Sequence, residues 1–93
     1  MIIKLTTAWD DYFNRRRPYQ KERLLTSEQA WNLSPGTHIM VMFSGCSGPL
    51  EFEIIDDWGI RQLVNVYSKE RQNADDVFNN LGEGTPFNVA WVI

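Results

Sequence analysis

A strict alternation of apolar and polar side chains over residues 50–54, within a predicted strand over 50–56, constrains the fold of this chain more than any other feature. Leu50, Phe52 and Ile54 share one face of an extended segment, and acidic residues occupy the other. Because successive side chains of a β-strand point to opposite faces, this pattern predicts a strand with one buried and one solvated side. The chain therefore contains a sheet with at least one strand of mixed polarity.

Three further segments have the composition of strands. Residues 38–43 are largely apolar on both faces, which is typical of a central strand. Residues 60–67 follow a turn in which Gly59 can take a positive φ, so the first three strands are expected to form an antiparallel meander. Residues 87–93 are so apolar that this last strand has to pair within the sheet or be covered.

Short helices are predicted from spacing and capping residues. Residues 8–16 carry aromatic side chains at helical spacing. Thr26 and Gln29 have the spacing of a capping box, which predicts a second helix over residues 27–32. Asn73 is positioned to cap a third short helix before the last strand.

The fold class is therefore α+β: a small antiparallel sheet or SH3-like barrel of four to five strands, with one or two short N-terminal helices and a short helix before the last strand. Because 93 residues bury a single core, one domain over residues 1–93 is expected, with a helical N-terminal element over 1–33 and a β-rich core over 34–93. The strand count and loop placement of residues 33–93 resemble those of small SH3-like barrels, a resemblance that implies no site residue. An open sheet packed by helices on one face is the alternative.

Composition narrows the class of protein. The hydrophobic content of 43% supplies a core, and no run approaches the roughly 20 apolar residues of a membrane span. The first residues lack the apolar stretch of a secretion signal, so a cytoplasmic location is expected. Cys46 is the only cysteine, which excludes an internal disulfide and a cysteine-based metal site within one chain. Neither a cofactor nor a metal is expected.

Charge is divided unevenly along the chain. Residues 1–24 hold six basic and three acidic residues, a net charge of +3, whereas residues 25–93 hold three basic and nine acidic residues, a net charge of −6. Charge of one sign on one segment creates a local potential that can orient a partner. This segregation favours binding over catalysis.

Two regions are candidates for that binding. In the basic segment, guanidinium groups can contact carboxylates or phosphates and tyrosine rings can stack on bases, although a solvated helix end explains the same residues. A tryptophan at the predicted turn is either an interface residue or a lid folded onto the core. The candidate partner-binding residues are Arg15, Arg16, Arg17, Tyr19, Lys21, Arg23 and Trp58.

The other candidate groups are better explained by structural roles than by catalysis or ligand binding. His38 and Cys46 bracket one strand, whose extended length would hold them more than roughly 20 Å apart. Glu51 and Glu53 are interpreted as the solvated face of their strand. The glycines at residues 82–84 close a helix and open a strand, which is the reverse of a phosphate-binding loop. No catalytic residue is assigned, and an enzyme is not expected.

The sequence thus predicts a small non-catalytic protein-protein interaction module, of adaptor or inhibitor type, that uses the basic aromatic segment and sheet loops. The alternative is a nucleic-acid-binding small barrel, which the acidic pI of about 5.0 makes the weaker interpretation. Pairing of an edge strand across a two-fold axis, which would give a homo-oligomer, stays open.

Overall fold

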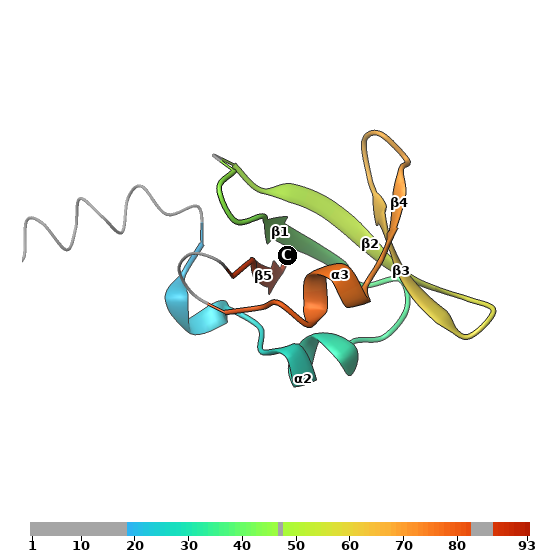
Figure 1. Ribbon diagram of the computed structural model, residues 1–93, viewed down its shortest axis with the longest axis horizontal. Coiled ribbons are helices and arrows are strands. Elements are labelled where there is room, and N and C mark those ends of the chain that lie inside the picture. The colour runs from blue at the N-terminus through green and yellow to red at the C-terminus, as the bar shows by residue number, and fades with distance from the viewer. Residues whose placement is uncertain (1–18, 47, 83–86) are drawn as a thin grey trace, which may run out of the picture.

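A computed structural model describes residues 19–46, 48–82 and 87–93 (Figure 1). Its centre is a five-stranded antiparallel sheet with the strand order β4-β3-β2-β1-β5. The elements are η1 (Lys21–Arg23), α2 (Ser27–Trp31), β1 (His38–Met42), β2 (Leu50–Asp57), β3 (Ile60–Asn65), β4 (Arg71–Asn73), α3 (Asp75–Phe78) and β5 (Val89–Val92).

The predicted α+β class is confirmed, and the sheet is open. After β4 the chain crosses back through α3, and β5 pairs with β1. β4 and β5 are therefore the two opposite edges of the sheet. Within the described residues no hydrogen bonds join these two edges, because β4 has only three residues and α3 intervenes before β5. The barrel alternative was therefore wrong, and the open sheet is correct.

The predicted meander is present, and β1 lies inside the sheet between β2 and β5. Ile39 of β1 lies opposite Phe52 of β2 on one side and Val92 of β5 on the other. The alternation that identified β2 corresponds to its burial, with Phe52 and Ile54 inaccessible and the intervening side chains partly exposed. The face that carries Ile39, Phe52 and Leu63 is the buried face of the sheet.

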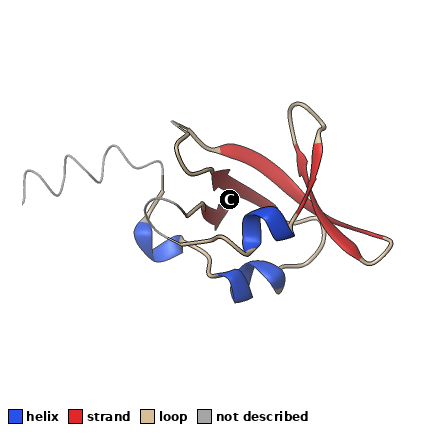
Figure 2. Cartoon of the chain, viewed as in Figure 1, coloured by secondary structure: helices blue, strands red, loops and turns tan. Residues whose placement is uncertain are grey.

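Helices α2 and α3 pack together beneath that face (Figure 2). Ala30, Val77 and Phe78 are fully buried in one cluster with the strands. The Trp31 ring meets Phe78 edge-on at 5.3 Å between centroids, and its Nε1 donates to Asn79 Oδ1 at 3.2 Å. Trp31 therefore combines apolar packing with a satisfied polar edge, as a half-buried tryptophan requires.

The predicted capping box at the start of α2 is confirmed. Thr26 Oγ1 accepts from the Gln29 backbone N–H at 3.1 Å, and Gln29 Oε1 accepts from the Thr26 N–H at 3.0 Å. The predicted cap of the third helix was wrong. Asn73 lies in β4 opposite Gln62, and Ala74 precedes the first turn of α3 without a side-chain cap.

The outer edge of β5 is covered by the chain that leads into α2. The backbone N–H of Leu25 donates to the Ala90 carbonyl at 2.8 Å, and the Arg23 guanidinium donates to the Val92 carbonyl. This cover satisfies groups that an edge strand would otherwise present to other chains. The helix predicted over residues 8–16 lies outside the described residues.

Candidate functional site

The most exposed large hydrophobic side chain of the described residues is Trp58, at the tip of the β2–β3 hairpin. Asp57 pairs with Ile60, so the connection consists of Trp58 and Gly59 alone. Both have a positive φ, 54° and 79°, which is the geometry of a type I′ turn. Trp58 is 97% exposed, so the lid interpretation was wrong.

Tryptophan is an unfavourable residue at this position for two reasons. The first position of a type I′ turn favours Asn, Asp or Gly, because a side chain with a bulky Cβ substituent in the left-handed region costs about 1–2 kcal/mol. In addition, the indole of Trp58 is left almost entirely in water. Strain and exposure at one residue are characteristic of sites retained for function rather than for folding.

Arg61 fixes the hairpin tip against the end of α2. Its Nη1 donates to the carbonyls of Trp31 and Leu33 at 2.9 and 2.7 Å, and its Nε and Nη2 hold both carboxylate oxygens of Asp56 at 2.9 and 3.2 Å. The hydrogen bond from Arg61 lowers the pKa of the Asp56 carboxyl, with the positive charge of Arg61 adding to this effect and partial desolvation opposing it. The hairpin tip is therefore anchored to the helical layer.

A hollow of about 450 Å³ lies beside the tip, between the hairpin and the two helices. Its charged groups are the carboxylates of Asp56 and Asp75 and the guanidinium of Arg61. Ile60, 55% exposed, adds apolar surface next to Trp58. We call the set Trp31, Asp56, Trp58, Gly59, Ile60, Arg61 and Asp75 the hairpin-tip site.

The predicted basic segment lies elsewhere in the molecule. Figure 1 shows the chain around η1 and the β2–β3 turn at opposite ends of the long axis. Tyr19 packs on Trp91 with ring centroids 5.3 Å apart, and Arg23 donates to the backbone of β5. Lys21 is exposed in η1. The structure therefore does not bring these residues together with Trp58.

The other predicted cations, Arg15, Arg16 and Arg17, lie outside the described residues. Of the candidate residues that the structure describes, only Trp58 belongs to the hairpin-tip site.

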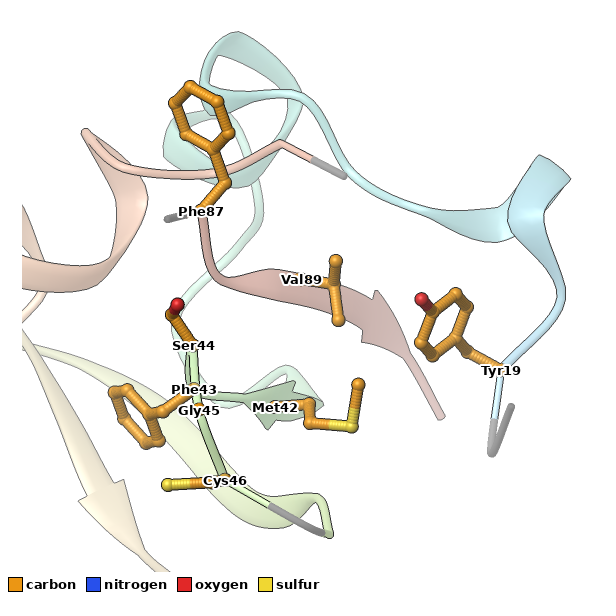
Figure 3. Close-up of a pocket in the computed structure, with 8 residues that line it drawn as sticks. All are labelled: Tyr19, Met42, Phe43, Ser44, Gly45, Cys46, Phe87 and Val89. Atoms are coloured by element: carbon orange, nitrogen blue, oxygen red, sulfur yellow. The ribbon is translucent and has the colours of Figure 1, made fainter. Parts of the chain in front are cut away.

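A second hollow, of about 220 Å³, is lined on one side by the loop that follows β1 (Figure 3). Met42 and Val89 point toward Tyr19, whereas the Cys46 thiol lies on the side of Phe43 (Figure 3). Cys46 is exposed, and its backbone N–H donates to the Phe43 carbonyl at 3.0 Å. Among the residues that the structure describes, no titratable side chain hydrogen-bonds to this thiol in the role of a base.

The polar face of the sheet carries one compact cluster around His38. Its Nδ1 lies 2.8 Å from Glu51 Oε2, and its Nε2 lies 3.8 Å from Glu53 Oε1. The two glutamates therefore serve as partners of a histidine as well as a solvated face. Across residues 19–46, 48–82 and 87–93, no group of three His, Cys, Asp or Glu side chains is arranged to hold a metal ion.

No protein-family model matches the chain, and no curated protein or solved structure is significantly similar to it. Among the helices that the structure describes, none has the length and apolar character needed to cross a membrane. The hairpin-tip site therefore has to be interpreted from its own geometry.

Sequence reasoning identified Trp58 but missed its neighbours. Ile60, Arg61 and Asp75 come from β3 and α3, and only the tertiary fold places them around one hollow. One available signal was the Trp-Gly pair that ends the predicted turn, because a two-residue hairpin turn favours Asn-Gly. A departure from that preference marks the turn as unusual.

Proposed function

We propose that this chain is a small non-catalytic protein-interaction module that binds its partner through the hairpin-tip site, with Trp58 as the central contact. The observation that carries this proposal is the 97% exposure of a tryptophan on a positive-φ backbone. Tryptophan is the residue type most enriched among the energetically dominant residues of protein interfaces. Burial of its ring by a partner would recover the free energy that its exposure forgoes.

The support for the tip provided by Arg61 adds to this proposal. A two-residue turn anchored to the carbonyls of Trp31 and Leu33 presents the indole from a fixed position. Rigid presentation lowers the conformational entropy that is lost on binding. An adaptor or an inhibitor that acts by occupying a surface would use such a tip.

The alternative function, binding of nucleic acid, gains no specific support from the described residues. Tyr19 stacks on Trp91 instead of standing free for a base, and the Arg23 guanidinium is engaged by β5. Phosphate binding requires cations at the contact surface, whereas the hairpin-tip site holds two carboxylates and one cation.

Site-specific photocrosslinking tests the proposed function. The full chain is produced in its source cells with a benzophenone amino acid in place of Trp58, and irradiated products are identified by mass. Tyr67 is the matched control, because it is 80% exposed and follows β3 at the end remote from the hairpin tip. We expect a discrete protein adduct from position 58 and none from position 67. Identical adducts from both positions, or none from either, would contradict the proposal.

A further inference from the structure

The charges around the hairpin tip are not balanced at the surface. Arg61 exposes only 12% of its side chain, and its donors are directed at Asp56 and two backbone carbonyls. Its charge is therefore committed within the fold. Asp75 lines the same hollow, is exposed, and has no ion-pair partner among the residues that the structure describes.

The second cation near the hairpin, Arg71, does not compensate for the charge of Asp75, because its partner is Asp57. Arg71 lies 3.6 Å from Asp57, and both side chains are about half exposed, at 56% and 44%. An exposed pair at this separation contributes little and exchanges readily with solvent or with another partner. Because Arg61 compensates Asp56, the accessible negative charge beside the hairpin tip comes from Asp75 and, in part, from Asp57.

Apolar and acidic surfaces are adjacent here. A lysine or arginine side chain matches both, because its aliphatic stem covers apolar surface while its charged head reaches a carboxylate. The face of an indole also attracts cations, and tryptophan is the strongest aromatic partner for them. Ile60 and Gly59 line the hollow that contains Asp75, and Trp58 directly precedes Gly59 in the turn. One basic side chain can therefore make both kinds of contact.

We infer that the partner of the hairpin-tip site is a basic protein segment, which places a lysine or arginine against Trp58 with its charged group toward Asp75. This inference rests on the proposed function, since it specifies the chemistry of the same partner. An acidic peptide or a phosphate backbone would meet the uncompensated Asp75 carboxylate at this surface and is disfavoured.

Selection from a phage library of random 12-residue peptides on the full chain tests this inference. Clones that also bind a Trp58→Ala variant are removed. We expect the remaining peptides to carry net positive charge, with an apolar residue beside a lysine or arginine. Asp75→Asn should weaken a synthesised representative about fivefold, the size of one partly desolvated ion pair. Asp76→Asn is the matched control, because Asp76 is also exposed but does not line the hollow.

Three results would overturn the inference, and they separate it from the proposed function. Trp58-dependent peptides that are neutral or acidic would refute the basic partner and leave the module intact. Absence of any Trp58-dependent peptide, together with absence of a crosslinked adduct, would refute both. A dimer in sedimentation velocity that Trp58→Ala abolishes would assign the site to a second copy of the chain. Circular dichroism of each variant confirms that it is folded.

Discussion

Arg61 holds the Asp56 carboxylate through two hydrogen bonds, from Nε to Oδ1 at 2.9 Å and from Nη2 to Oδ2 at 3.2 Å. The same guanidinium closes the end of α2 by donating to the carbonyls of Trp31 and Leu33. One side chain therefore joins the β2–β3 hairpin to the helical layer and to the hollow beside Trp58. Its removal should affect stability as well as the site.

Arg61→Met should lower the free energy of unfolding by about 2 kcal/mol, because two carbonyls and a carboxylate lose a charged donor. Urea unfolding followed by circular dichroism measures this loss. Arg71→Met serves as the control, since its exposed 3.6 Å pair with Asp57 should contribute less than about 0.5 kcal/mol. Equal losses in the two variants would show that Arg61 is not an anchor.

The Asp56 interaction should also make stability depend on pH. The pKa of Asp56 in the folded chain lies below its ordinary value of 3.8, chiefly because Arg61 hydrogen-bonds to the charged form. A depressed folded-state pKa adds stability above the unfolded value, and that stability is lost as the pH falls through the folded-state pKa. The difference in unfolding free energy between the wild type and Asp56→Asn should therefore shrink from about pH 6 to about pH 2. A difference that stays constant over this range would contradict the assignment.

Trp58→Asn should stabilise the domain while it abolishes partner binding. Asparagine tolerates the left-handed backbone of the first turn position, so the unfolding free energy should rise by about 1 kcal/mol and the melting temperature by about 4–8 °C. Trp58→Ala lacks the local hydrogen bond by which an asparagine side chain tolerates a φ of 54°, and it should show a smaller gain. Thermal unfolding of both variants makes the comparison. A fall in melting temperature for Trp58→Asn would show that the tryptophan is retained for stability.

Gly82→Ala should destabilise the approach to β5. A Cβ at this position would lie 2.7 Å from Phe87 Cγ and 3.0 Å from Phe87 Cβ, and the resulting displacement should cost about 1–3 kcal/mol. Gly48→Ala is the control, because its Cβ would meet nothing within 4 Å. Adding Phe87→Ala to Gly82→Ala should remove most of the extra cost in urea unfolding. If the changes in unfolding free energy of the two substitutions are simply additive, a steric conflict with Phe87 is not the cause of the destabilisation by Gly82→Ala.

Elements with a local signal were predicted well. Residues 50–54 alternate between apolar and acidic side chains, and the Thr26–Gln29 capping box marks the start of α2. β4 was missed because its three residues, Arg71–Asn73, are polar and pair through backbone groups that carry no side-chain pattern. The same pairing removed Asn73 from its predicted capping role.

The candidate site was less predictable, for a physical reason. The exposure of Trp58 depends on whether the hairpin bends toward the core. The position of the hairpin is held by hydrogen bonds from Arg61 to Trp31 and Leu33, which are 30 and 28 residues away in the sequence. Long-range contacts of this kind leave no periodicity in the sequence. Tyr19 shows the converse, since an aromatic in a basic segment looked available for binding and instead packs on Trp91.

The shortness of the β2–β3 connection has a consequence for kinetics. With only Trp58 and Gly59 between paired residues, no flexible loop remains to be ordered when a partner arrives. Encounter should resemble docking of two rigid surfaces, so substitutions in the hairpin-tip site should act mainly on the dissociation rate. A lengthened turn would have the opposite effect. The loop that carries the indole would have to become ordered on binding, so the same contacts would give a lower association rate and a lower affinity.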